Sequence, residues 1–293
     1  MNPSNQNNQT AEYGLDPIFQ QTIHIVNTGS YVSKAGLQIR LDDDREMREN
    51  TRFYQFPFTV YDIPPYPFST SIEVINSDSI EAGKRLVLEG FRPAVLNFAN
   101  RTNAGGGVLW GAKSQEESLF RRTNLFRSLF QFMDYAEEYN LPKNRRQYPM
   151  DRNYGGIYTP YATVFRGIDY AGNPLLEQPF KMSFISVAAM LHPQLVNNRI
   201  ADSLIPGVKN KIRTIFRIGL FHGHDSLVLG AFGCGAFRNP PHHIAELFKE
   251  VLAETEFHNK YRKIVFAIIE DCNSGGTLNP NGNLKPFMDV FLE

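Results

Sequence analysis

The stretch Ala94–Glu117 reads AVLNFANRTNAGGGVLWGAKSQEE and contains three features that decide how the fold is interpreted. Its first residues form a short apolar run, which predicts a buried β-strand. Three consecutive glycines follow and predict a loop whose backbone something else approaches closely. A Gln-Glu-Glu cluster comes after seven further residues, so carboxylates are expected beside this loop. Carboxylates beside a loop without side chains suggest chemistry on a bound ligand.

Strand and helix patterns alternate on either side of this stretch. Strands are predicted at Ser71–Ile75, Ala94–Ala99, Ser183–Ala189, Ser226–Phe232 and Lys263–Ile269, and helices at Ser79–Glu89, Ser114–Tyr139, Ile205–Phe221 and Pro241–Glu256. Gly90 lies where a glycine commonly follows a helix end. Strands this apolar are typical of a sheet covered by helices on both faces. The sequence therefore predicts an α/β protein with a three-layer α/β/α architecture.

The residues before this domain differ from it in composition. Residues 1–14 are polar and rich in Asn and Gln, and we expect a disordered tail there. Residues 15–68 form a smaller accessory region, which ends in a connector at 56–68 that is rich in proline and aromatic residues. The catalytic domain is expected at residues 69–293. Within it, the long basic segment Tyr139–Gly156 is interpreted as a surface excursion.

The composition excludes several classes of protein. The 293 residues are 42% hydrophobic, which is enough for a sizeable core, and Lys+Arg and Asp+Glu both total 30. This balance gives no overall attraction to nucleic acid or membranes. Two cysteines, Cys234 and Cys272, allow no disulfide framework. Because the chain also has no secretion-signal pattern or membrane-length apolar run, we expect a soluble intracellular protein.

A second glycine-rich loop follows another predicted strand, in SLVLGAFGCGAFRNPP at Ser226–Pro241. In an open α/β sheet, ligands bind beyond the carboxyl ends of the strands, where loops enter helix amino termini. Free backbone N–H groups at such positions hold phosphate oxygens. Two such loops beside one crevice would suit a diphosphate. The alternative is that these glycines only turn the chain.

The carboxylates of Glu116 and Glu117 also have two interpretations. In the structural one, Ser114 and Glu117 form a capping box at a helix start, which needs no chemistry. In the functional one, one carboxyl group is a general acid and the other positions the substrate. A helix amino terminus favours the ionised carboxylate, so a bound diphosphate would have to raise the pKa of the acid. Spacing alone does not choose between these interpretations.

The order GGG, VLWGAKS, QEE resembles the signature of the poly(ADP-ribose) glycohydrolase family. GAFGCGAF is similar to the diphosphate-binding loop of that family, and GGIYTPYATVFRG and KIVFAIIEDC resemble its microbial members. The resemblance covers about residues 15–293. It implies a macrodomain with a mixed central sheet and an appended N-terminal region. It also implies hydrolysis of the ribose–ribose O-glycosidic bond of poly(ADP-ribose), with no cofactor and no metal.

The resemblance also implies roles for individual residues. Glu117 would be the catalytic acid, Glu116 would hold the ribose hydroxyl groups, and Phe237 would pack against the ribose. The substrate-binding residues would be Asn100, Gly105, Gly106, Gly107, Gln115, Gly233, Cys234, Gly235, Ala236 and Phe237.

Partners and alternatives follow from the same resemblance. The expected partners are poly(ADP-ribose) or ADP-ribose and ADP-ribosylated proteins, in the reversal of ADP-ribosylation and the DNA damage response. We expect a monomer that binds no membrane and no specific nucleic-acid sequence. The alternatives are a hydrolase that removes single ADP-ribose groups from protein or nucleic acid, and a non-catalytic ADP-ribose-binding macrodomain.

Two weaker patterns have simpler interpretations. Arg121, Arg122 and Arg127 could form a basic rim that contacts the polymer, together with Lys143, Arg145, Arg146 and Arg152 beyond them. A solvated helix face and loop is the simpler reading. His222 and His224 could suggest a metal site, but no third ligand has a recognisable spacing to them.

Overall fold

The computed structural model describes residues 16–142, 147–270 and 282–292, so the polar tail expected at residues 1–14 lies outside the described residues. The α-helices are α1 (Pro17–Thr28), α2 (Arg45–Asn50), α3 (Ser79–Leu88), α4 (Gln115–Arg122), α5 (Leu125–Phe130), α6 (Ile205–Phe221), α7 (Pro241–Leu252) and α8 (Leu284–Phe291). The strands are β1 (Ser30–Val32), β2 (Gln38–Arg40), β3 (Arg52–Tyr54), β4 (Ser71–Ile75), β5 (Pro93–Phe98), β6 (Gly156–Arg166), β7 (Leu175–Val187), β8 (Leu195–Val196), β9 (Arg199–Ile200), β10 (Ser226–Leu229) and β11 (Lys263–Ala267).

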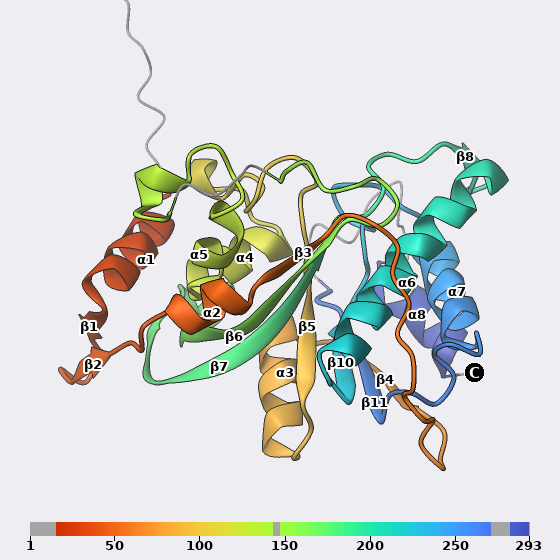
Figure 1. Cartoon of the computed structure of the whole chain (residues 1–293), viewed down its shortest axis with the longest axis horizontal. Helices are drawn as coiled ribbons and strands as arrows, with labels where there is room; N and C mark the ends of the chain where they lie inside the picture. Colours follow the sequence, from red (N-terminus) through yellow and green to blue (C-terminus); the bar gives the residue numbers. More distant parts are fainter. Residues whose placement is uncertain (1–15, 143–146, 271–281, 293) are drawn as a thin grey trace, which may run out of the picture.

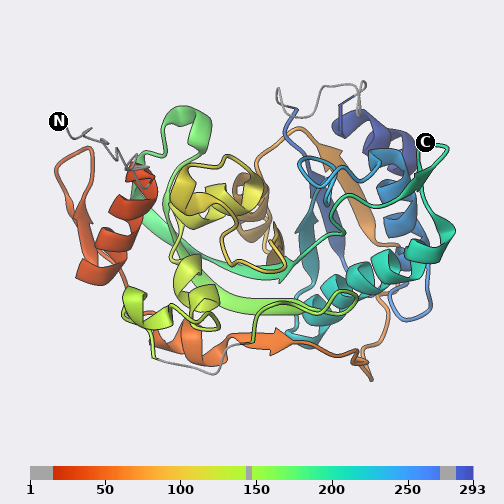
Figure 2. The same cartoon turned by 90° about the horizontal axis from the view of Figure 1, so that it is seen from above.

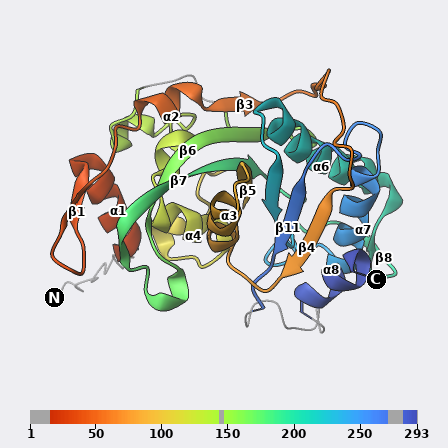
Figure 3. The same cartoon turned by 90° about the horizontal axis from the view of Figure 1, so that it is seen from below.

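One seven-stranded sheet, in the order β3-β6-β7-β5-β10-β11-β4, runs through the molecule (Figure 3). The five strands from β7 to β4 are parallel to one another. β6 and β3 add an antiparallel edge next to β7. The sheet is therefore mixed, as the family resemblance implies.

Helices cover both faces of this sheet and create two hydrophobic cores. Residues alternate across β5: Val95 belongs to the core formed with α3, α4 and α5, whereas Leu96 belongs to the core formed with α6, α7 and α8. This alternation is the period of two that a β-strand requires. Figure 1 shows α3 and α6 on opposite sides of the sheet, and Figure 2 shows α1 and α8 at opposite ends of the molecule. Among the described residues, no helix combines the length and the apolar character that a membrane crossing needs.

The apolar runs identify five of the seven strands of the main sheet. β4 has the predicted bounds, whereas β10 ends at Leu229, three residues before the predicted end, and a turn follows at Phe232 and Gly233. The helix predicted at Ile205–Phe221 is α6. Gly90 follows α3 with a left-handed φ of 83°, as expected for a glycine after a helix end. The predicted three-layer α/β/α architecture is confirmed.

The single helix predicted at Ser114–Tyr139 is wrong. α4 ends at Arg122, and Asn124 Oδ1 then accepts a hydrogen bond of 2.7 Å from the N–H of Thr163 in β6. Helical structure resumes only as α5 and as a short 3-10 helix at Ala136–Tyr139. Pairing with the sheet thus interrupts a segment whose local pattern is that of one helix.

β6 and the segment before it also differ from expectation. The apolar runs do not predict β6, because Pro160 lies within it, at a position where the register of β6 against β7 shifts. The surface excursion predicted at Tyr139–Gly156 is wrong in part, since Tyr148 is 3% exposed and Met150 is fully buried. The basic composition of this segment gives no sign in the sequence of the buried Tyr148 and Met150.

The accessory region packs directly on the main domain. The ring of Phe19 in α1 lies edge-on to Phe126, with centroids 5.7 Å apart, and Met47 in α2 is buried in the same core. β3 pairs with β6 at the edge of the main sheet. The two parts of the chain therefore share one core. The division of the chain near residue 68 stays a prediction.

Replacing Arg122 by methionine should destabilise the fold strongly. Arg122 is fully buried, and its guanidinium lies 2.8 Å from the carboxylate of Asp78. Because the substitution leaves a buried carboxylate without its cation, we expect the free energy of unfolding to fall by about 3–5 kcal/mol in urea denaturation. Arg45→Met is the control, since both side chains of its pair with Asp43 are 70% exposed. It should lose less than about 1 kcal/mol, and equal losses would contradict the prediction.

Candidate active site

The candidate site lies where two loops leave neighbouring parallel strands. β5 leads into the triglycine loop (residues 103–112) and then α4, and β10 leads into the second loop (residues 230–239) and then α7. β5 and β10 pair in parallel, with Ala94 opposite Leu227. Both loops therefore emerge at the same edge of the sheet, as the sequence predicts.

Gln115 fixes the start of α4 against the end of β5. Its Oε1 accepts a hydrogen bond of 2.9 Å from the N–H of Phe98, and its Nε2 donates to the carbonyl of Leu96 at 2.7 Å. The side-chain amide thus pairs with β5 as the backbone of a neighbouring strand would. This contact holds the next two residues of the helix at the carboxyl end of β5.

Glu116 is buried, and both of its carboxylate oxygens accept hydrogen bonds. Oε1 accepts from the N–H of Gly105 at 3.1 Å and from Asn97 Nδ2 at 3.4 Å, and Oε2 accepts from the N–H of Asn100 at 2.8 Å. Burial raises the pKa of Glu116 from 4.5 to about 8, against the opposing effect of these donors, and the negative charge of Glu117 raises it further. Glu116 therefore links the end of β5 to the triglycine loop. Burial favours the neutral form of its carboxyl group.

Glu117 has one bonded and one unbonded carboxylate oxygen. Oε1 accepts a hydrogen bond of 3.0 Å from the N–H of Gly107, and the buried Oε2 has no hydrogen-bond partner among the described residues. The capping box is wrong, because the Ser114 side chain makes no capping hydrogen bond at the start of α4. The carboxylate of Glu117 is directed at the triglycine loop.

Gly105–Gly107 allow the loop to come within hydrogen-bond distance of both carboxylates. Gly106 has a left-handed φ of 57°, and a Cβ there would overlap Oε1 of Glu117. The first and third glycines donate their N–H groups to the two carboxylates, and the second donates to the carbonyl of Asn103 at 3.1 Å. The N–H groups of these glycines are therefore bonded within the protein, and the loop can offer a ligand only its remaining surface.

Asn100 connects the end of β5 to the triglycine loop. Besides its N–H bond to Glu116, its Oδ1 accepts hydrogen bonds from the N–H groups of Thr102 at 2.9 Å and Asn103 at 3.1 Å. Its Nδ2 has no partner among the described residues. The half-buried side chain thus keeps two N–H donors for a ligand.

The second loop presents unbonded backbone to solvent. Gly233 is required by the fold, because its φ is 75° and a Cβ would lie 2.6 Å from Asn239 Nδ2. Gly235 is different: its φ is not left-handed, and no atom lies within 4 Å of a Cβ placed there. The N–H groups of Gly235, Ala236 and Phe237 have no partner in the described parts of the chain. Adjacent free N–H groups of this kind suit an anion.

Cys234 and Phe237 are held by packing. Cys234 is 1% exposed in the core formed with α6, α7 and α8, and burial raises the pKa of its thiol well above the ordinary value. A nucleophilic thiolate is therefore disfavoured. Phe237 is half-buried at the margin of the same core, and its carbonyl accepts a hydrogen bond of 2.9 Å from the N–H of His192.

Two residues that no sequence pattern assigned to the site, Asn97 and Tyr135, also form contacts there. Asn97 is fully buried in β5 and donates to Ser186 Oγ at 3.0 Å as well as to the first carboxylate. Its position in an apolar run is a usable signal, because a buried amide needs a partner. The hydroxyl of Tyr135 donates to Asn103 Oδ1 at 3.2 Å and supports the start of the triglycine loop. No sequence signal indicates that contact.

The basic rim and the solvated helix face are both wrong for the arginines of α4 and α5. Arg121 and Arg122 are 4% and 0% exposed, and Arg121 lies 2.9 Å from Asp16. Arg127 pairs with Asp44 at 2.7 Å. These guanidinium groups are buried in ion pairs, so they are not free to contact an anionic polymer. Lys143, Arg145 and Arg146 of the expected rim lie outside the described residues.

His222 and His224 are ordered by contacts with the protein. His224 Nδ1 donates to the carbonyl of Arg92 at 3.0 Å, and its Nε2 accepts from the hydroxyl of Tyr158 at 3.0 Å. The ring of His222 stacks on Tyr158, with centroids 3.5 Å apart. Within residues 16–142, 147–270 and 282–292, no group of three or more His, Cys, Asp or Glu side chains is arranged to hold a metal.

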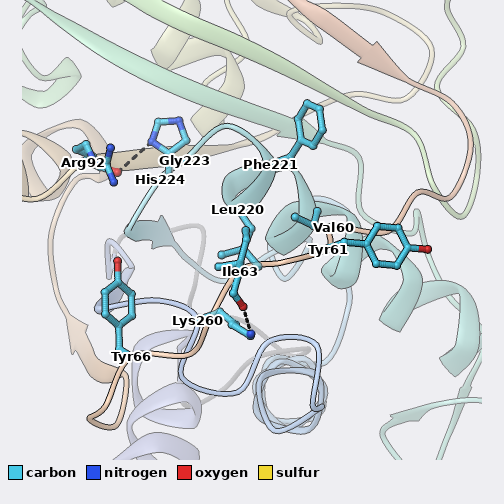
Figure 4. Close-up of a pocket in the computed structure, with 10 residues that line it drawn as sticks. All are labelled: Val60, Tyr61, Ile63, Tyr66, Arg92, Leu220, Phe221, Gly223, His224 and Lys260. Atoms are coloured by element: carbon cyan, nitrogen blue, oxygen red, sulfur yellow. Dashed lines mark hydrogen bonds between the residues drawn. The ribbon is translucent and has the colours of Figure 1, made fainter.

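A cavity of about 430 Å³ lies beside His224, away from the two loops (Figure 4). The connector before β4, the end of α6 and the turn before β10 line it, and Lys260 Nζ donates to the carbonyl of Ile63 there. Arg92, which precedes β5, is also part of the lining. The cavity is therefore at the amino ends of the parallel strands, the opposite edge from the candidate site.

Glu116 should make stability depend on pH. Its pKa is about 8 in the folded protein and 4.5 as the ordinary value, so its stabilising contribution is fully present below about pH 4.5 and is lost as pH rises towards 8. We expect the melting temperature of the wild type to fall relative to Glu116→Gln over this range. Melting curves at several pH values test this. If the difference in melting temperature between the wild type and Glu116→Gln does not change with pH, the pKa of Glu116 is not raised.

Comparisons with known proteins agree with the resemblance noted in the sequence. The family model described as "Microbial-type PARG, catalytic domain" matches residues 19–167, just over half of the chain. The solved structure of poly(ADP-ribose) glycohydrolase (PARG) from Thermomonospora curvata is 26% identical, with a TM-score of 0.76, and covers 94% of this chain and 98% of that one. No curated protein matches the chain.

Two further solved structures contain ligands. PARG from Thermomonospora curvata bound to the inhibitor ADP-HPD is 26% identical with a TM-score of 0.74 and the same coverage. PARG from Deinococcus radiodurans in complex with ADP-ribose is 27% identical with a TM-score of 0.62, over 86% of this chain and 98% of that one. The fold, the two loops and these matches together show that the chain belongs to the microbial-type poly(ADP-ribose) glycohydrolase family of glycosidases.

Proposed function

We propose that this protein hydrolyses the ribose–ribose O-glycosidic bond of poly(ADP-ribose) and releases ADP-ribose, with Glu117 as the general acid. The observation that carries the assignment is the asymmetry of its carboxylate. The N–H of Gly107 holds Oε1 at 3.0 Å, and the buried Oε2 has no partner among the described residues. A carboxyl group fixed through one oxygen can carry a proton on the other and give it to a leaving oxygen.

The second loop and Asn100 supply the groups that would bind the substrate. The unbonded N–H groups of residues 235–237 would hold the diphosphate, which is the chemistry that free backbone donors favour. Asn100 Nδ2 would donate to the ribose on the far side of the scissile bond. Glu116 Oε2 accepts one hydrogen bond, so it keeps a lone pair for a ribose hydroxyl group.

The arrangement supports a mechanism with one acid. Cleavage of a riboside passes through an oxocarbenium-like state, and many glycosidases use a second carboxylate as nucleophile or base. Glu116 is poorly suited to that role, because three donors already bind its carboxylate and burial favours its neutral form. A water molecule oriented by the substrate diphosphate would then attack the anomeric carbon while Glu117 protonates the departing ribose oxygen. The proton that this water loses would return to the Glu117 carboxylate, directly or through solvent, and restore the acid.

Family membership favours the polymer glycohydrolase over the two alternatives. An ADP-ribose-binding macrodomain without activity has no use for a carboxyl group held in this way. A hydrolase for single ADP-ribose groups would use the same acid, so only the preferred substrate distinguishes the two enzymes. Faster cleavage of a mono-ADP-ribosylated protein than of the polymer would favour the hydrolase for single ADP-ribose groups. ADP-ribosylated proteins, a monomeric state and an intracellular location are part of the same proposal.

Replacing Glu117 by glutamine should remove catalysis and keep binding. The amide oxygen of glutamine can still accept the N–H of Gly107, but the side chain cannot donate an acidic proton. We expect turnover of poly(ADP-ribose) to fall roughly 100-fold or more, because general acids contribute about 10²–10⁴-fold. The affinity for ADP-ribose, measured by calorimetry, should change by less than about threefold.

Glu177→Gln is the matched control for that variant. Glu177 is an exposed carboxylate on β7, and its replacement should leave turnover unchanged. Free ADP-ribose, separated by chromatography, is the product to be measured. Near-normal turnover by Glu117→Gln would exclude Glu117 as the acid.

Replacing Gly235 by alanine should weaken binding without weakening the fold. A Cβ at this position meets no protein atom within 4 Å, so the melting temperature should stay close to that of the wild type. The same Cβ would occupy space needed by the diphosphate, and we expect ADP-ribose to bind about tenfold more weakly, roughly 1.4 kcal/mol. Gly233→Ala is the contrasting variant and should lower the melting temperature. Unchanged affinity in Gly235→Ala would place the diphosphate elsewhere.

A further inference from the structure

Arg121 lies on α4 one helical turn after Glu117 and is bonded to the far end of the triglycine loop. Its side chain is 4% exposed. Nε donates to Asp16 Oδ2 at 2.9 Å, one terminal nitrogen donates to the carbonyl of Ala112, and the other lies 3.8 Å from the carboxylate of Asp169. One guanidinium thus joins α4, the triglycine loop and the N-terminal segment.

Two hydrogen bonds of the loop connect Ala112 back to Glu117. The N–H of Ala112 donates to the carbonyl of Gly107 at 3.2 Å, and the N–H of Gly107 donates to Glu117 Oε1 at 3.0 Å. Arg121 and Glu117, four residues apart on the same helix, therefore hold the two ends of one backbone turn. Glycines have little conformational preference of their own, so such a turn needs external bonds to stay in place.

Asp16, the residue before α1, anchors these contacts from the N-terminal segment. Its Oδ1 accepts the N–H of Phe19 at 2.9 Å and caps α1, and its own N–H donates to the carbonyl of Leu109 at 2.9 Å. The ring of Phe19 packs on Phe120 of α4, with centroids 6.2 Å apart. The start of α1 is thus bonded to the triglycine loop at two points, directly at Leu109 and through Arg121.

We propose that Arg121 is a positioning residue, which with Asp16 of the N-terminal segment holds the triglycine loop so that the N–H of Gly107 stays on Glu117. The inference rests on the proposed function and deepens it. In this arrangement the accessory region is part of the catalytic apparatus, because it supports the backbone that orients the acid. A misplacement of about 1 Å in such a group can lower a rate about 100-fold.

The pair formed by Arg127 and Asp44 provides the matched control. It is also an ion pair between the accessory region and this helical layer, at 2.7 Å, with side chains 12% and 11% exposed. The remaining side-chain bonds of this pair go to Arg48 and to the carbonyls of Tyr139 and Asn140, so the pair does not reach the triglycine loop. A purely structural role would make both pairs behave alike.

The test compares Asp16→Asn and Arg121→Lys with Asp44→Asn and Arg127→Lys. Asparagine is itself a good helix cap, so Asp16→Asn keeps the cap of α1 and removes only the charge that faces Arg121. We expect Arg121→Lys to lower kcat roughly 10–100-fold, with the dissociation constant for ADP-ribose changed less than about threefold. Asp16→Asn should lower kcat less, and the double variant should lose less than the product of the two single losses. The control variants should keep kcat within about threefold at equal folded fraction.

Hydrogen exchange of the loop gives a second measurement that does not depend on turnover. Amides of residues 105–112 should exchange faster in Asp16→Asn and Arg121→Lys than in the wild type, and at the wild-type rate in the controls. Equal effects of the two pairs on kcat and on exchange would overturn the proposal. A wild type that releases no ADP-ribose would instead overturn the proposed function, and the exchange rates would still decide whether Arg121 and Asp16 hold the loop.

Discussion

Backbone N–H groups of the triglycine loop bind the two carboxylates at the start of α4, and the geometry of the candidate site depends on these contacts. Gly105 donates to Glu116, and Gly107 donates to Glu117. A side chain on the glycine between them would collide with the second carboxylate. The glycines thus allow close contacts with Glu116 and Glu117 within the protein. Free backbone N–H groups that a ligand could reach lie in the second loop.

The same contacts give the two adjacent glutamates different chemical environments. Glu116 is bonded through both oxygens, and burial raises its pKa to about 8, so it acts as a fixed point for the loop. Glu117 is bonded through one oxygen only. Two identical side chains, next to each other in the sequence, therefore differ in their freedom to transfer a proton. The difference arises because successive helical residues point about 100° apart.

Buried arginines connect this site to the rest of the protein. Arg121, Arg122 and Arg127 each pair with a carboxylate, and two of those carboxylates, Asp16 and Asp44, come from the accessory region. A charged helix with arginines near its end is usually solvated, so its sequence suggests a surface. Here α1 and α2 cover the helices, and the charges are paired because burying them alone would be too costly.

The sequence by itself determined the layers of the fold and brought two glycine-rich loops to the same edge of the sheet. Apolar strand runs, glycines at turns and the Gln-Glu-Glu cluster depend on local periodicity and backbone freedom, which a sequence displays directly. Only the tertiary structure decided that α4 stops at Arg122, that β6 accommodates Pro160, that Asn97 bonds to Glu116, and that Arg121 bonds to the triglycine loop. These outcomes depend on which distant segments pack together. The energies of such long-range contacts outweigh local preferences and leave no local pattern in the chain.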